Sequence, residues 1–251
     1  MAIILITTLT CGYLVQSQNS EKQLDNSTSS IQSHKEHDAR TINENVFANS
    51  SPVLPNTILP HSVADIDHKV KLQADEDGKL IVNSDTRDLF EFYLSAMGEE
   101  PLQSILTRIR YEIENQLPSP AKDQAFLLLK NFVDYKIELS LLSTDLKNLT
   151  TGQSSLLDSL KLQKSKVASL RAQYFSPGTY QAFFQQEASY DDFMLAQLTI
   201  QQNNQLNDEQ KNQQLQALLN ELPQEVKQVR EIVSRHSELF QSTEDMRDQG
   251  A

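Results

Sequence analysis

Apolar residues cover more of the stretch between positions 85 and 98 than one helix face requires. Asp85 is a good N-cap and Gly98 a good C-terminal residue, so the pattern predicts a helix between them. Phe90, Leu94 and Met97 share one face at helical spacing. Four more apolar residues extend the surface around the helix: Leu89, Phe92, Tyr93 and Ala96. Such a helix is buried nearly all round. A small helical unit covers one side, and the other side suggests a partner.

Helical patterns continue after this stretch. Pro101 suits the first turn of a second helix, which carries one apolar stripe made of Leu102, Ile105, Ile109 and Ile113. Residues 117–120 read Leu-Pro-Ser-Pro and break the chain, so we expect a domain boundary there.

A long helical pattern begins at Ala125. Between residues 139 and 174 its apolar residues keep three- and four-residue spacing. Thr150, Thr151 and Gly152 are weak helix formers and predict a bend or break. Heptads of this kind indicate intramolecular packing or a coiled coil more often than a binding site.

Three more helices are predicted towards the C-terminus. Ser176-Pro177-Gly178 ends the long pattern, and residues 179–200 carry the next helix. Asn207 is the candidate N-cap of a helix that ends at Leu222-Pro223. A last helix covers roughly residues 225–240.

The amino-terminal third has a different pattern. Residues 1–15 are hydrophobic but short for a membrane span, which needs about 20 residues, and no basic residue precedes them. We expect a signal or anchor whose start lies upstream, or a marginal export segment. Residues 16–56 are polar with isolated apolar positions, which favours a disordered tether. Residues 70–82 alternate loosely around Asp77-Gly78, which predicts a turn in a small hairpin or extended segment.

The predicted fold class is therefore all-α, with an extended multi-helix arm behind a small N-terminal helical domain. The expected organisation is a hydrophobic segment at 1–15, a tether at 16–56, a small helical domain at 57–118, an extended helical domain at 119–222 and the start of a further helical domain at 223–251.

Composition narrows the function classes. The 251 residues carry a formal net charge of −12, which argues against a nucleic-acid binder and against docking on anionic lipid. The single Cys11 excludes an intrachain disulfide framework and a cysteine-based zinc site. No nucleophile elbow, phosphate loop or metal-spaced histidine pair supports catalysis. We expect no enzyme, no cofactor, no metal and no small-molecule substrate.

Residues 87–96 resemble the signature of the lipase-specific foldases, which are membrane-anchored steric chaperones of secreted bacterial lipases. That signature is Arg, two free positions, Phe-Asp-Tyr, Phe or Cys, Leu, Ser or Thr, and Ala. The matching residues are Arg87, Phe90, Leu94, Ser95 and Ala96. The departures are Glu91 for Asp, Phe92 for Tyr and Tyr93 for Phe or Cys. Later stretches also resemble the family, among them Phe183-Phe184 and Leu222-Pro223.

The resemblance implies a secreted triacylglycerol lipase as partner and an inner-membrane location with the helices on the periplasmic side. It also implies a chain truncated at its C-terminal end. The implied partner-binding residues are Arg87, Phe90, Glu91, Phe92, Tyr93, Leu94, Ser95 and Ala96, with Arg108 on the next helix.

Purely structural roles for these residues stay open as alternatives to partner binding. Arg87 either pairs locally with Glu91 at i+4 or fixes the small domain or its partner, and the resemblance favours the second. The local alternative for Ser95 is a hydrogen bond back to the carbonyl of Glu91. Phe90 and Leu94 fit the core, whereas Phe92 and Tyr93 lie off that stripe and fit a contact.

Two alternative functions remain. A periplasmic, membrane-tethered coiled-coil scaffold without foldase activity would explain the heptads but not residues 87–96. The second alternative is an enzyme such as a hydrolase, and it is disfavoured because the sequence lacks the catalytic residues that a hydrolase needs.

Overall fold

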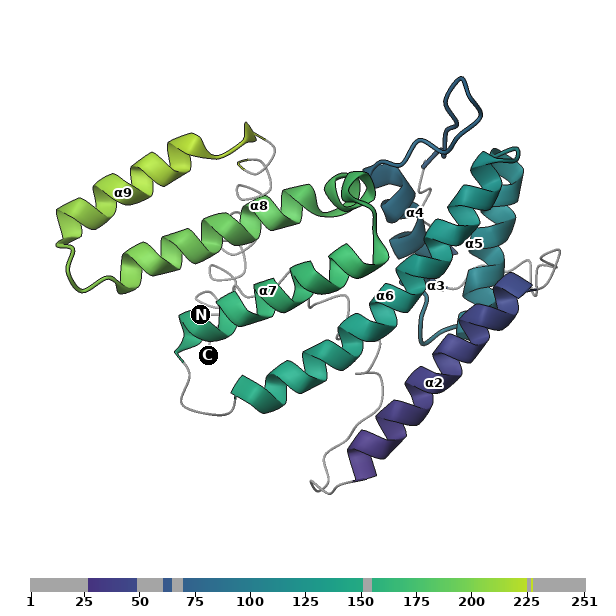
Figure 1. The fold of residues 1–251 in the computed structure, drawn as a ribbon, viewed down its shortest axis with the longest axis horizontal. Coiled ribbons are helices and arrows are strands. Elements are labelled where there is room, and N and C mark those ends of the chain that lie inside the picture. The colour runs from purple at the N-terminus through teal and green to yellow at the C-terminus, as the bar shows by residue number, and fades with distance from the viewer. Residues whose placement is uncertain (1–26, 49–60, 65–69, 151–154, 225–226, 228–251) are drawn as a thin grey trace, which may run out of the picture. The chain divides into compact units, whose positions relative to one another are not determined.

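The computed structural model describes residues 27–48, 61–64, 70–150, 155–224 and 227. Within these ranges the chain is helical apart from turns and isolated β-bridges. The helices are α2 (Ser27–Ala48), α3 (His61–Ala64), α4 (Ser84–Leu94), α5 (Leu102–Gln116), α6 (Ala121–Thr150), α7 (Leu156–Tyr174), α8 (Pro177–Gln202) and α9 (Asp208–Glu221) (Figure 1). The predicted all-α class is confirmed.

Helix α4 begins and ends earlier than predicted. Its N-cap is Asn83 instead of Asp85, because the Asn83 Oδ1 atom accepts a hydrogen bond from the Thr86 N–H at 3.1 Å. The helix ends at Leu94, and a turn follows in which Gly98 has a φ of +100°. Gly98 therefore lies within the turn after the helix and does not end the helix itself.

The later helices follow the predicted pattern closely. Helix α6 ends at Thr150 and α7 begins at Leu156, so the predicted break is confirmed. Helix α8 begins at Pro177, two residues before the predicted start, since proline is tolerated in a first helical turn. Asn207 caps α9 as predicted. The helix predicted at 225–240 lies outside the described residues apart from Lys227.

The turn predicted at Asp77-Gly78 is present. Asp75 Oδ1 accepts hydrogen bonds from the backbone N–H groups of Asp77 at 3.0 Å and Lys79 at 2.8 Å. Gly78 has a φ of +76°, and an antiparallel bridge joins Ala74 to Leu80. The Asp75 carboxylate therefore holds the turn itself.

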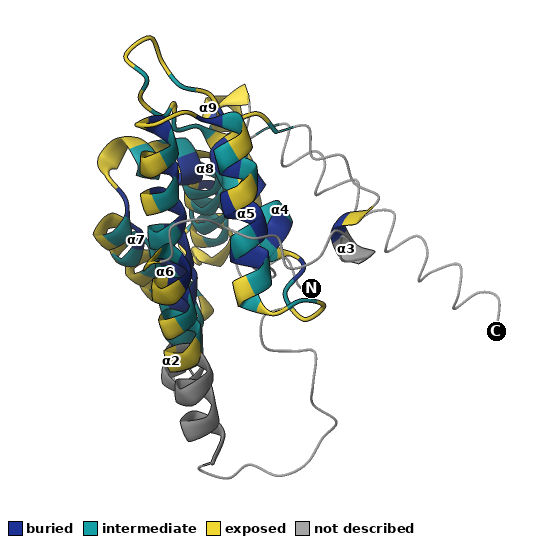
Figure 2. Ribbon diagram, turned by 90° about the vertical axis from the view of Figure 1, so that its right-hand side faces the viewer, coloured by how far each residue is buried: buried dark blue, intermediate teal, exposed yellow. Residues whose placement is uncertain are grey.

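The described residues fall into two compact units. The first takes in Met1–Gly152 and Ser165–Phe183, and the second Gln153–Lys164 and Phe184–Ala251, as far as these ranges are described. In the first unit α2, α4, α5 and α6 pack on one another (Figure 1). Figure 2 shows buried positions along α4, α5 and α6. Ile105, Ile109 and Ile113 are at most 1% exposed, so the predicted stripe is the core face of α5.

Helix α2 corrects the prediction of a disordered tether for residues 27–48. Arg110 donates a hydrogen bond to the Val46 carbonyl, and its guanidinium lies 5.6 Å from the Phe47 ring centroid and 4.9 Å from that of Phe126. The Asn43 Nδ2 atom donates to the Lys130 carbonyl at 3.1 Å.

An ion pair also joins Arg40 of α2 to Glu138 of α6. Composition missed these contacts because it counts only the apolar residues of α2, whereas α5 and α6 supply the rings and charges that hold it. The rest of the predicted tether lies outside the described residues.

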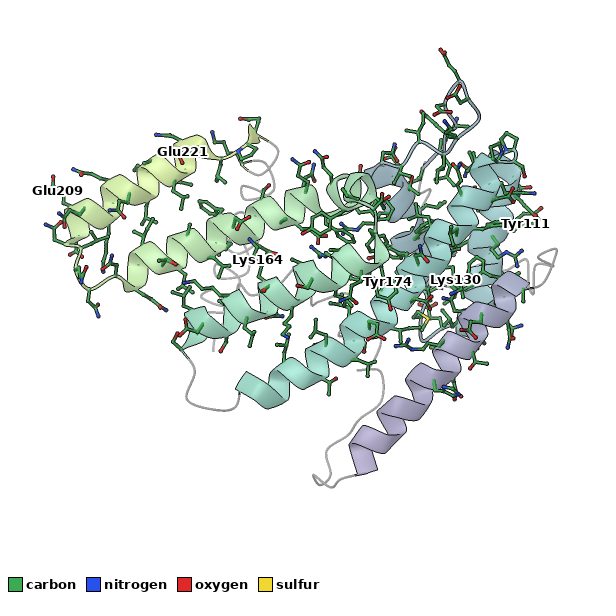
Figure 3. The ribbon with its side chains drawn as sticks, viewed as in Figure 1. Tyr111, Lys130, Lys164, Tyr174, Glu209 and Glu221 are labelled. Atoms are coloured by element: carbon green, nitrogen blue, oxygen red, sulfur yellow. The ribbon has the colours of Figure 1, made fainter. Side chains whose placement is uncertain are left out.

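The second unit is built differently. Helix α9 runs beside the later part of α8 in the opposite direction (Figure 1). Phe184, Phe193 and Leu222 are buried in its described part, and four half-buried residues pack on the cluster of Phe193 and Leu222: Tyr190, Met194, Leu218 and Leu219. An ion pair joins Lys164 of α7 to Asp192 of α8. Glu209 and Glu221, both exposed, lie at the two ends of α9 (Figure 3).

None of the helices in the described ranges is long and apolar enough to cross a membrane. Residues 1–15, the predicted hydrophobic segment, lie outside those ranges. The domain boundaries inferred from the sequence stay a prediction.

Candidate partner-binding site

Helix α4 carries the signature residues on three stripes. Thr86, Leu89, Phe90 and Tyr93 are buried, and their spacing puts them on one face. Phe90 is fully buried and its ring lies 5.6 Å from that of Phe132 on α6. This face is the core face of α4, and it fixes the helix on α5 and α6.

The core face is rotated relative to the prediction. Phe90 is in the core as expected, but Leu94 is half-buried and Tyr93 is only 9% exposed. Tyr93 was expected to be a contact residue and Leu94 a core residue. The helix is apolar on several sides, so periodicity alone does not select the side that packs.

A second stripe flanks the core face and carries two charges. Arg87 donates a hydrogen bond to the carbonyl of Phe183 at the start of α8. Glu91 accepts hydrogen bonds from Lys136 of α6, at 3.1 Å through Oε1 and 3.2 Å through Oε2. The structure thus gives Arg87 a contact with a backbone carbonyl instead of the local pair with Glu91.

The third stripe points away from the core. Asp88 and Ser95 are exposed and Phe92 is half-buried, at i, i+4 and i+7 spacing. The Ser95 Oγ atom donates to the Phe92 carbonyl at 2.6 Å, not to that of Glu91. Ala96 is 2% exposed and belongs to the core. Ser95 and the half-buried Phe92 are therefore the signature residues on the side of α4 that faces away from the core, and Asp88 joins them although the sequence did not single it out.

An aromatic cluster lies beneath the flanking stripe. Ring centroids lie 6.0 Å apart for Phe132 and Phe183, 5.8 Å for Phe175 and Phe183, and 5.3 Å for Tyr135 and Phe175. The Arg171 Nε atom donates to the Tyr135 hydroxyl at 3.1 Å. Residues from α6, α7 and α8 thus meet under α4, within the first unit.

Arg108 is buried on α5, close to α4. It pairs with Glu100 through Nε–Oε2 at 3.0 Å and Nη2–Oε1 at 2.7 Å, a two-pronged geometry that strengthens the interaction. The hydrogen bond to Glu100 raises the pKa of Arg108. Burial, with the charge of Glu112, raises the pKa of Tyr93 to about 12, against the opposing effect of Arg108.

Arg110, the alternative to Arg108, instead holds α2 through the Val46 carbonyl. Burial lowers its pKa. Arg108 is therefore the arginine that lies near the signature helix.

Sequence reasoning missed Lys136, the partner of Glu91. Its signal is a basic residue among the apolar and aromatic residues of α6, in a stretch that also carries Asp134: Phe132, Val133, Tyr135 and Ile137. Phe183 was noted as an apolar anchor of the predicted helix at 179–200 and as part of the resemblance, but not as the contact of Arg87. Within the described ranges no group of three or more His, Cys, Asp or Glu residues is arranged to hold a metal ion.

Fold and site define an all-α protein whose candidate site is a helix face. A family model described as proteobacterial lipase chaperone protein matches residues 128–251, beginning within α6 and after α4. The lipase chaperone of Stutzerimonas stutzeri (strain A1501) is 36% identical over 168 residues, which make up 67% of this chain and 49% of that protein. The lipase chaperone of Acinetobacter baylyi is 32% identical over 197 residues, 78% of this chain and 56% of that protein.

The lipase chaperone of Chromobacterium violaceum is 28% identical over 177 residues, 70% of this chain and 55% of that protein. The chain belongs to the lipase chaperone family. It spans about half the length of the curated relatives it matches.

Proposed function

We propose that this chain is a steric chaperone, without catalytic activity of its own, that helps a secreted triacylglycerol lipase reach its active fold. The observation that carries the proposal is the 36% identity over 168 residues to a curated lipase chaperone. The signature helix α4 supports the proposal through its third stripe, hereafter the outer stripe. This stripe consists of Asp88, Phe92 and Ser95 and faces away from the core, where a partner would bind.

The mechanism rests on differential binding. A chaperone that binds the near-native lipase better than a stalled intermediate shifts the population towards the near-native state. Faster folding further requires that the chaperone bind the folding transition state of the lipase more tightly than the stalled intermediate, as an enzyme binds its transition state more tightly than its substrate. Two helical units offer a large surface for this, in the class of interfaces above about 2,000 Å². The mechanism requires no nucleotide.

We further propose that the helices act on the periplasmic side of the inner membrane, held there through residues 1–15. The hydrophobic pattern of this segment supports the proposal. A fusion of a periplasm-dependent reporter enzyme to the C-terminus should be active in cells. An inactive reporter on an intact fusion would contradict the proposed location.

The central test is the refolding of a denatured lipase encoded beside this chain. We expect lipase activity to rise with the ratio of chaperone to lipase and to level off, whereas an equal mass of an unrelated helical protein gives no increase. Equal activity with and without the chain at every ratio would refute the proposal. Self-association on a sizing column without lipase would then favour the coiled-coil scaffold.

A further inference from the structure

Lys136 holds the acidic residue of the signature from a different helix. Its side chain is 9% exposed and that of Glu91 27% exposed, and the Lys136 Nζ atom lies within 3.2 Å of both carboxylate oxygens. An exposed ion pair contributes little because water screens it. This pair is mostly withdrawn from water, so breaking it leaves a poorly hydrated charge.

The same lysine touches the aromatic cluster. Its Nζ atom lies 5.9 Å from the centroid of the Phe132 ring, and that ring packs on Phe90 of α4. Lys136 therefore contacts both the charged flank of α4 and a ring that supports its core face.

The position of the pair fixes how α4 is rotated. Arg87 and Glu91 lie just over one helical turn apart on the same flank, and each is bonded to another helix. Core packing alone would allow several rotations, because α4 is apolar on more than one side. Two polar contacts on one flank select the rotation that leaves Asp88, Phe92 and Ser95 facing outwards.

We propose that Lys136 is a positioning residue of the partner-binding surface. Through Glu91 it holds α4 in the orientation that presents the outer stripe to the lipase. The inference rests on the proposed chaperone function and names a residue outside the signature on which that function depends.

The test compares Lys136→Met with Lys122→Met. Lys122 also joins α6 to another helix, through Glu114 of α5 at 3.8 Å with both side chains 29% exposed, but this pair does not involve α4. For Lys136→Met we expect the chaperone concentration that gives half-maximal lipase refolding to rise on the order of tenfold, within the range seen for coupled contacts. Lys122→Met should change it less than about twofold, as expected for a partly exposed pair.

Three further variants separate positioning from general destabilisation. Lys136→Arg keeps the charge and should recover most of the activity. The double variant Glu91→Gln/Lys136→Met should be no worse than Lys136→Met, because the pair acts as a unit. Ile137→Ala removes a buried neighbour on α6 and serves as a variant of lowered stability. It should lower the unfolding midpoint without the tenfold rise in half-maximal concentration.

Hydrogen exchange of the α4 amides provides a second readout in the same variants. Lys136→Met should speed exchange in α4 while leaving α5 unchanged. The proposal would be overturned if Lys136→Met refolded the lipase as well as wild type and showed wild-type exchange in α4. It would also be overturned if Ile137→Ala, at the same unfolding midpoint as Lys136→Met, lost as much refolding activity. If the wild-type chain itself does not raise lipase activity, the chaperone function fails, and α4 exchange alone decides whether Lys136 holds the helix.

Discussion

The two compact units bury their apolar side chains to different extents. In the first, Phe132 is fully buried and contacts the rings of Phe90, Tyr135, Phe175 and Phe183. In the second, no residue of α9 is buried, and the described cluster centres on Phe193 and Leu222. Stability varies across a protein with local burial. The first unit is held by a shared aromatic core, whereas the apolar residues around the described cluster of the second unit are only half-buried.

Phe132→Ala should have the largest effect, because it removes the ring shared by four aromatic contacts. A buried phenylalanine replaced by alanine costs about 3–5 kcal/mol. Denaturant unfolding followed by circular dichroism should show this loss, with α4 and α5 amides losing their protection from exchange. A loss below about 1 kcal/mol would mean that the first unit relaxes around the gap and that its core is as adaptable as that of the second unit.

Phe193→Ala should cost less, about 3 kcal/mol, at the low end for a buried phenylalanine, since its half-buried neighbours can relax into the gap. Tyr190 and Met194 are only partly buried against it. We expect faster amide exchange in α9 and unchanged exchange in α4. Equal loss of protection in both helices would remove the distinction between the units.

Much of the fold could be predicted because each helix carries its own signals. The isoleucine stripe of α5 and the Asn207 cap of α9 lie within a few residues of the elements they define. The contacts of α2 could not be predicted this way. They depend on Arg110 and Phe126, which are more than 60 residues away from the residues that they hold.

The candidate site shows the same limit more sharply. The sequence identified α4 as a helix with excess apolar surface, and Phe90 as core. It misjudged Tyr93 and Leu94 because several apolar faces compete, and the choice between them depends on residues far along the chain. Lys136 and Phe183 make that choice through polar contacts that periodicity does not register.

Alkaline pH should affect the first unit through Tyr93. Its hydroxyl ionises near pH 10 when exposed and near pH 12 in the folded chain. Between these values the folded state keeps a proton that the unfolded state has lost, so stability falls as the pH rises. Unfolding at pH 9 and pH 11 should show a loss about 1–2 kcal/mol larger in wild type than in Tyr93→Phe. The same pH dependence in both proteins would place the alkaline sensitivity elsewhere.

Loss of a helix cap should give the smallest effect and should separate the units by location. Asn207 accepts a hydrogen bond from the Gln210 N–H at 2.9 Å, and Gln210 Oε1 accepts one from the Asn207 N–H at 3.0 Å. Asn207→Ala should cost about 1 kcal/mol, and so should the matched change Asn83→Ala at α4.

The consequence differs because α4 is held by its core face, whereas α9 has no buried residue. Asn207→Ala should therefore speed exchange in the first turn of α9 at residues 208–211, with little change in global unfolding. Asn83→Ala should instead lower global stability without local fraying, since Thr86 and Phe90 keep the start of α4 packed. Fraying at α4 equal to that at α9 would show that the core of the first unit does not restrain the signature helix, and the difference between the units would then lie in their buried area alone.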